Sequence, residues 1–248
     1  MRELKQIKAQ EIFSTNHVIK FFDDESYAKE LFRTGEMLFR PIKSFKESKQ
    51  PGRGDAGEGK VNQHFSLYCK KDKDDLFEKV VDITAIHLDV NRPIYCYSRL
   101  TGRNFHPNGA IYINPQMIND FSSGKQTFCA VLDKALFEKK ILEFLNAHDI
   151  AATIANIKYS DDDVDKEIIM QTLSGDSDLA YFHKSKAYKE QQERRIMIDE
   201  NIDSLIERGV GEKFNDGIKF YIGDLSKVGC IAKPIFFNLT KNYISAAD

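Results

Sequence analysis

The chain has 248 residues, of which 42% are hydrophobic and 30% are charged, and its formal net charge is −2. These values are typical of a soluble globular protein, and the length lets one domain bury a full core. A net charge near zero excludes a broadly basic nucleic-acid-binding protein but leaves a local basic groove open. No segment is apolar enough to span a membrane, and the first residues lack the apolar stretch of a signal peptide. We therefore expect a cytoplasmic protein without membrane contact.

Strand and helix patterns alternate along the chain without repeats, which predicts a mixture of α and β structure in one domain. In the first half we expect a helix at 26–34, which ends at Gly35. The expected strands of this half are at 17–22, 37–41, 65–69, 83–88 and 93–98.

In the second half, residues 134–147 predict an amphipathic helix. Its apolar face is expected to hold Leu136, Phe137, Ile141, Leu142 and Leu145, which are spaced by one to four residues. Further strands are expected at 127–132, 151–159, 192–198 and 218–222, and a short helix at 201–208.

Two sets of side chains that could suggest metal or disulfide chemistry are more simply explained. The acidic run at 161–165 predicts a solvated loop, because nothing fixes its carboxylates relative to one another. The four cysteines are far apart, without a Cys-x-x-Cys pair or a histidine at ligand spacing. We therefore expect reduced thiols and no metal site.

A segment rich in glycine and charge, residues 48–62, predicts a loop. Part of it matches the first seven positions of a phosphate-binding P-loop. Val61 stands where that loop needs a Ser or Thr, and no apolar strand precedes it, so a P-loop is not predicted. Arg53, Asp55 and Glu58 lie among the glycines and could contact a ligand closely. The alternative is a flexible solvated loop.

A polar cluster fills residues 184–196. If a strand begins near Gln191, alternation puts Gln191, Glu193 and Arg195 on one face and Arg194 on the other. A surface helix with a Glu190–Arg194 pair is the alternative. The apolar residues that follow favour the strand, and its polar face suggests a cleft.

Gln191-x-Glu193 resembles the signature of the mono-ADP-ribosyltransferases, in which a Gln or Glu precedes the catalytic Glu by two residues. The wider pattern Tyr188-x-x-Gln191-x-Glu193-x-Arg195 and the loop Arg53–Gly59 are similar to those of uncharacterised bacterial and phage proteins. The resemblance implies a single ADP-ribosyltransferase-like domain over residues 1–248. It also implies an α+β fold, with a split mixed β-sheet core and flanking helices, and NAD as a substrate without a metal.

The resemblance also implies roles for single residues. Glu193 is expected to be catalytic, and Gln191 to position the acceptor. Ser98 is expected to support Glu193 and the nicotinamide ribose, whereas Thr101 lies further along the chain than the usual spacing. His17, on the opening strand, is expected to contact NAD; an ordinary strand-end histidine is the alternative.

Two more residues are expected to bind NAD. Tyr188 would stack on the nicotinamide or the acceptor, unless it is simply a core residue, and Arg53 would bind the pyrophosphate. When nicotinamide leaves NAD, the ribosyl cation resembles the oxocarbenium transition state of glycosidases, which a nearby carboxylate stabilises. Such chemistry needs neither a metal nor a second cofactor.

Members of this family commonly act as toxins or antiphage effectors, so a macromolecular acceptor and a neutralising antitoxin or immunity partner are expected. RNA or DNA is favoured over protein as the acceptor, on Gln191 and on a basic run beside it, which contains Lys184, Lys186, Lys189, Arg194 and Arg195. Two alternatives stay open. One is an NAD glycohydrolase on the same scaffold, and the other is an inactive binding module in which Gln191, Glu193 and Arg195 form a structural polar network.

Overall fold

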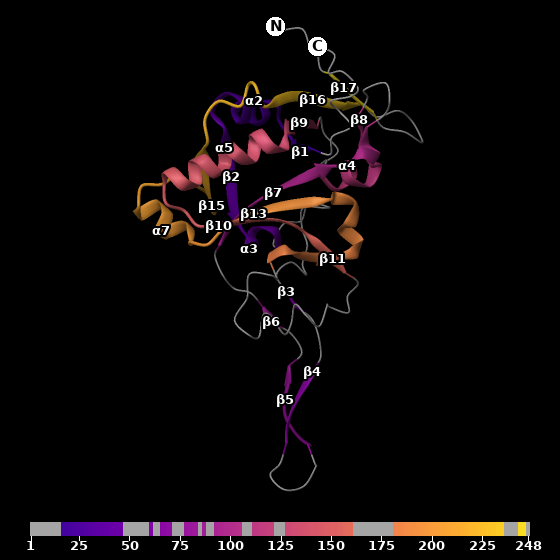
Figure 1. Cartoon of the computed structure of the whole chain (residues 1–248), viewed down its shortest axis with the longest axis vertical. Coiled ribbons are helices and arrows are strands. Elements are labelled where there is room, and N and C mark those ends of the chain that lie inside the picture. The colour runs from indigo at the N-terminus through magenta and orange to yellow at the C-terminus, as the bar shows by residue number, and fades with distance from the viewer. Residues whose placement is uncertain are drawn as a thin grey trace.

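The computed structural model describes residues 16–46, 60–61, 65–70, 77–83, 86–87, 92–105, 111–121, 127–160, 181–235 and 243–246. Helices pack on a large antiparallel sheet, which confirms the α+β class (Figure 1). The helices are α2 (Glu25–Thr34), α3 (Ile42–Lys46), α4 (Pro115–Phe121), α5 (Lys134–Ala147) and α7 (Ile202–Glu207), with 3-10 turns η1 (Gly102–Asn104) and η3 (Lys186–Gln191).

The strands fall into one main sheet and three small pairs. The main sheet contains β1 (His17–Phe22), β2 (Glu36–Pro41), β7 (Pro93–Leu100), β8 (Ile111–Tyr112), β9 (Phe128–Asp133), β10 (Ala152–Asn156), β13 (Glu193–Ile198), β14 (Glu212–Phe214), β15 (Gly217–Tyr221), β16 (Gly229–Ile235) and β17 (Tyr243–Ala246). The pairs are β3 (Lys60–Val61) with β6 (Ile86–His87), β4 (Phe65–Lys70) with β5 (Phe77–Ile83), and β11 (Lys158–Ser160) with β12 (His183–Ser185).

The main sheet runs in the order β14-β15-β2-β7-β1-β9-β16-β17-β8, while β13 also pairs with β7 and carries β10 on its far side. Every pairing between its described strands is antiparallel, and β11–β12 is the one parallel pair among the strands that the structure describes. The main sheet is therefore antiparallel, not mixed as the resemblance implied. Antiparallel neighbours can be joined by tight turns, as β14 and β15 are, and need no crossover helix.

Most of the expected elements are present, and their ends follow from local chemistry. The side chain of Asp24 caps the start of α2 by accepting a hydrogen bond from the Ser26 amide. Gly35 ends the helix in the left-handed region, with φ of 70°. A Cβ at Gly35 would lie 2.5 Å from the backbone oxygen of Gly223, so this position needs glycine for its conformation and for space.

Three expectations need correction. The segment 151–159 is not one strand: β10 pairs with β13, the chain turns at the buried Ile157, and β11 pairs with β12. The expected strand at 83–88 is divided between the end of β5 and β6. In α5, Phe137, Ile141 and Leu145 are buried at intervals of four residues, but Leu136 and Leu142 are 48% and 47% exposed. The apolar face of this helix is narrower than its sequence suggested, because the helix contacts the sheet along one row.

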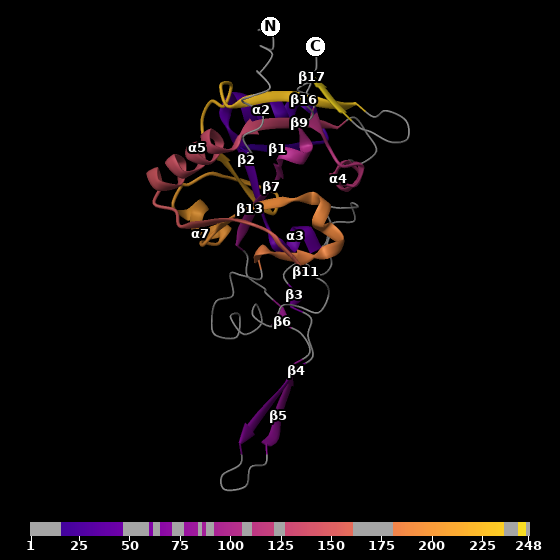
Figure 2. The ribbon, with the colours of Figure 1, turned by 45° about the vertical axis from the view of Figure 1, so that its right-hand side comes forward.

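Two hydrophobic layers cover opposite faces of the sheet around β1 and β7. Val18 and Tyr97 pack with α2 and α5 on one face, whereas Ile19 and Leu100 pack with α4 on the other. Figure 2 shows α5 and α4 on different sides of β9, and the β4–β5 hairpin extending away from the main sheet. No helix in the described ranges is long and apolar enough to cross a membrane. Cys96, Cys129 and Cys230 are free thiols, as expected.

Candidate functional site

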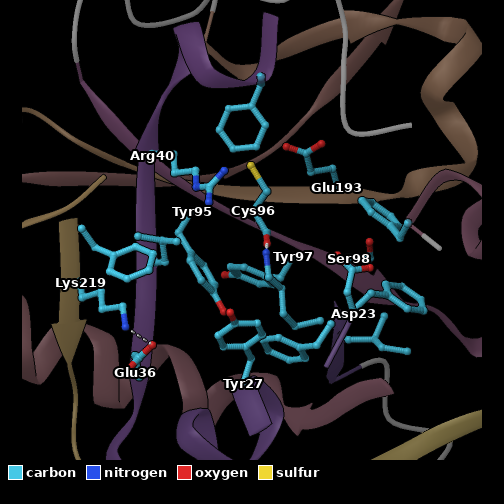
Figure 3. Close-up of a pocket in the computed structure, with 18 of the residues that line it drawn as sticks. Asp23, Tyr27, Glu36, Arg40, Tyr95, Cys96, Tyr97, Ser98, Glu193 and Lys219 are labelled. Atoms are coloured by element: carbon cyan, nitrogen blue, oxygen red, sulfur yellow. Dashed lines mark hydrogen bonds and ion pairs between the residues drawn. The ribbon is translucent and has the colours of Figure 1, made fainter. Parts of the chain in front are cut away.

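The main sheet opens along one edge of β7, and a cavity of about 330 Å³ lies at the opening (Figure 3). On this edge, residues 98–100 of β7 pair with β1 and residues 93–94 pair with β2. The three residues between them, 95–97, pair with neither β1 nor β2 on this edge. The Nζ atom of Lys20 donates a 2.6 Å hydrogen bond to the backbone oxygen of Cys96. A side chain of β1 thus satisfies a carbonyl that the split sheet leaves without a strand partner.

Charged side chains from five strands and from the turn after β1 line this cavity: Lys20 of β1, Asp23 of the turn, Glu36 and Arg40 of β2, Lys184 of β12, Glu193 of β13 and Lys219 of β15. The Nζ atom of Lys219 is 2.9 Å from a carboxylate oxygen of Glu36, which neutralises that pair. The half-buried guanidinium of Arg40 has no hydrogen bond or ion pair within the described ranges. In Figure 3 it lies on the opposite side of Cys96 from Glu193. The cavity therefore contains a cation available to an anionic ligand.

Glu193 is the centre of a buried ion-pair network. Its Oε2 atom lies 2.6 Å from Nζ of Lys184, and its Oε1 atom accepts hydrogen bonds from Nη2 and Nε of Arg195 at 2.6 and 3.0 Å. Arg195 is fully buried, and its Nη1 atom donates to the backbone oxygen of Tyr181. Period two along β13 puts Glu193 and Arg195 on one face, as the sequence predicted.

Burial alone would raise the pKa of Glu193. The charges of Arg195 and Lys184 outweigh it, with help from a hydrogen bond involving the Cys96 side chain, and hold the pKa well below its ordinary range. The carboxylate is therefore ionised at every pH at which the protein would normally work. Removing it would leave two buried cations without their common partner.

Gln191 joins the network through a turn and not as part of the strand. It ends η3, and Gln192 takes the left-handed conformation, with φ of 46°, before β13 begins at Glu193. Gln191 is fully buried: its side-chain oxygen is 3.3 Å from Nζ of Lys184, and its side-chain nitrogen is 3.1 Å from Oδ2 of Asp120. In this conformation its amide is held by α4 and β12.

Ser98 is directly opposite Glu193 in the β7–β13 ladder, and both residues line the cavity. The resemblance to the transferases implied such a pair, and the fold brings the two residues together. Tyr188 is not among the residues that line the cavity; its ring centroid is 5.6 Å from Nζ of Lys184. Tyr188 therefore lies next to Lys184, one of the two cations that pair with Glu193.

Of the other expected NAD-binding residues, His17 lies away from Glu193, and Arg53 is not among the described residues. His17 is at the start of β1, where its ring packs edge-on against Phe105 at 5.7 Å, and it does not line the cavity. Arg53, Asp55 and Glu58 lie outside the described residues.

The basic run near Glu193 is divided among three environments. Lys184 and Arg195 are buried in the Glu193 network, whereas Arg194 points to the other face of the sheet, 2.6 Å from Oε1 of Glu138. Lys186 and Lys189 remain exposed on η3. The run therefore does not form one continuous basic surface.

Sequence reasoning missed the contribution of β2. Glu36, Leu38 and Arg40 line the cavity, while Met37 and Phe39 between them are buried. The available signal was the pair of charged residues at 36 and 40, an even number of positions apart in a strand and so on one face, but it did not show which residues across the sheet these charges would meet. No group of His, Cys, Asp and Glu able to hold a metal ion is present in the described ranges.

Comparison of the chain with protein-family models, with curated proteins and with solved structures found no match.

Proposed function

We propose that the protein is an NAD-dependent ADP-ribosyltransferase, with the opening beside β7 as its NAD site. The observation that carries the proposal is the pairing of Glu193 with Ser98 at the wall of this cavity. These are the residue types that the transferase signatures require next to the nicotinamide ribose.

The proposed reaction breaks the C–N bond between nicotinamide and ribose, and the electron pair leaves with nicotinamide. Glu193 would stabilise the positive charge that grows on the ribose. A nucleophile of the acceptor would then bond to the same ribose carbon and lose its proton to solvent. The network supports this role because it keeps the carboxylate ionised and fixed in position. The positive charges of Lys184 and Arg195 oppose the growing charge on the ribose. The stabilisation of the transition state is therefore the difference between the effect of Glu193 and the effect of these two cations.

Arg40 is the proposed contact for the NAD pyrophosphate. Its planar guanidinium can bind phosphate oxygens bidentately, and it has no competing anion in the described ranges. Tyr27 lines the same cavity, is 55% exposed and offers a ring surface for stacking. This assignment adds a residue of β2 to the proposed site.

The acceptor is proposed to be a macromolecule, with RNA or DNA favoured over protein, and the biological role to be that of a toxin or antiphage effector with a neutralising partner. The exposed Lys186 and Lys189 on η3 are the parts of the basic run that could reach an anionic acceptor. The side chain of Gln191 would have to break its hydrogen bonds with Asp120 and Lys184 before it could form hydrogen bonds with the edge of a base.

A specific observation favours a second candidate function, an inactive binding module. The Glu193 carboxylate already has two buried cationic partners, and Gln191 is fully buried, as in a structural polar network. In such a module the cavity would bind a ligand without chemistry.

Nicotinamide release from NAD by the full chain separates these functions. Release that Glu193→Asp abolishes while the variant stays folded, judged by circular dichroism, supports an enzyme; absence of release supports the module. Transfer is tested with NAD labelled in the adenylate half and a cell lysate, followed by separate nuclease and protease treatments. Label removed by nuclease supports a nucleic acid acceptor, label removed by protease supports a protein acceptor, and release without stable label supports a glycohydrolase.

A further inference from the structure

A second cavity, of about 420 Å³, is present at the end of β7. It is lined by Asn16, His17, Arg99, Leu100, Thr101, Lys134, Asn156 and Arg194. Arg99 and Arg194 directly follow Ser98 and Glu193, and side chains of successive strand residues point to opposite faces. This cavity therefore faces α5, on the other side of the sheet from Glu193.

Three cations surround this cavity, but one carboxylate accounts for only two of them. Glu138 of α5 contacts Lys134 at 3.3 Å and Arg194 at 2.6 and 3.2 Å. Within the described ranges Arg99 has neither an ion pair nor a side-chain hydrogen bond, and its Nε atom is buried. Arg99 as a whole is half-buried. A buried polar atom without a partner is costly, so the Nε atom of Arg99 calls for an acceptor that the described residues do not supply.

We propose that this cavity binds a small phosphate monoester. Arg99, Lys134 and Arg194 carry three positive charges against one negative charge of Glu138, and the excess of two matches the charge of a phosphate monoester near neutral pH. The guanidinium of Arg99 can bind two phosphate oxygens.

The size of the cavity favours an organic phosphate over the bare ion. Its volume falls within the range of small-molecule pockets, about 300–1,000 Å³. Asn16, Thr101 and Asn156 surround the charged part with neutral polar groups that suit hydroxyl groups of a sugar. The site is separate from the proposed NAD cavity and does not depend on the function proposed for it.

The test measures binding of inorganic phosphate, uridine monophosphate and uridine by calorimetry. Uridine monophosphate is expected to bind more tightly than inorganic phosphate, and uridine is expected not to bind. Equal affinity of phosphate and uridine monophosphate would show that the cavity recognises the phosphate group alone, and the ligand would then be free inorganic phosphate. Uridine binding as tightly as its monophosphate, or no binding of either phosphate compound, would overturn the proposal.

Three variants locate the binding. Arg99→Met is expected to weaken phosphate-compound binding about 10- to 150-fold, the loss typical of a hydrogen bond to a charged group. Because it removes a half-buried cation whose buried Nε atom has no hydrogen-bond partner, it should melt no lower than the parent protein in the absence of phosphate. Arg103→Met changes an exposed neighbour outside the cavity, and Arg40→Met changes the other cavity; both should bind as the parent does. Unchanged affinity in Arg99→Met, or an equal loss in Arg40→Met, would refute the assignment.

Discussion

Replacing Glu193 by Gln is expected to destabilise the protein strongly, whatever the protein catalyses. The carboxylate is 3% exposed and is the common partner of Lys184 and Arg195. Gln keeps the shape and one acceptor oxygen but removes the charge that compensates the two buried cations. Breaking a buried ion pair by neutralising one partner costs about 3–5 kcal/mol. For a chain of this size, such a loss lowers the melting temperature by about 6–20 °C.

Thermal unfolding followed by circular dichroism measures this loss. The matched control is Glu200→Gln, because Glu200 also has an arginine partner, Arg208, but the pair is solvent-accessible. Solvent-exposed ion pairs contribute little, so this control should melt close to the parent protein. Adding Lys184→Met to Glu193→Gln should recover part of the lost stability, since it removes one uncompensated cation. If Glu193→Gln melts at the same temperature as the control, the charge of Glu193 does not stabilise the fold through Lys184 and Arg195.

Three further predictions concern acid, NAD and a helix end. Because folding lowers the pKa of Glu193, its contribution to stability is full above the ordinary value of 4.5 and is lost as pH falls below that value. The stability gap between the parent and Glu193→Gln should therefore be constant from about pH 7 to about pH 5 and narrow from about pH 4.5 to about pH 3, and a gap that stays constant over the lower range would contradict this. Arg40→Met should weaken NAD binding about 10- to 150-fold in a titration while Arg103→Met does not, and equal affinities would remove Arg40 from the proposed site. Gly35→Ala should lower the free energy of unfolding by about 1–3 kcal/mol because of its left-handed conformation and the close backbone of Gly223, whereas Gly102→Ala, with open space around it, should be nearly neutral in the same denaturation experiment.

The pattern of neighbouring residues in the sequence was enough to predict most of the helices and strands. Alternation along β1 and β13, the four-residue spacing in α5 and the glycine after α2 are properties of neighbouring residues, and they place these elements within one or two residues of their ends. The same alternation put Glu193 and Arg195 on one face of their strand. Local pattern failed at 151–159, where the chain changes partner strands, because strand pairing is set by distant segments.

For the candidate site too, the sequence predicted individual residues but not the contacts between distant parts of the chain. The sequence by itself marked Glu193, Gln191 and Ser98 as candidates, but it could not show that Lys184 and Arg195 neutralise Glu193 from two sides, or that Arg194 turns to Glu138 across the sheet. Nor could it show that Arg40 lies on the same cavity as Glu193, whereas His17 belongs to another. Charge, burial and hydrogen bonding depend on which groups come within a few ångströms of each other, and strand pairing between residues up to about a hundred positions apart decides that. The residue types were therefore determined by the sequence, and their partners only by the tertiary structure.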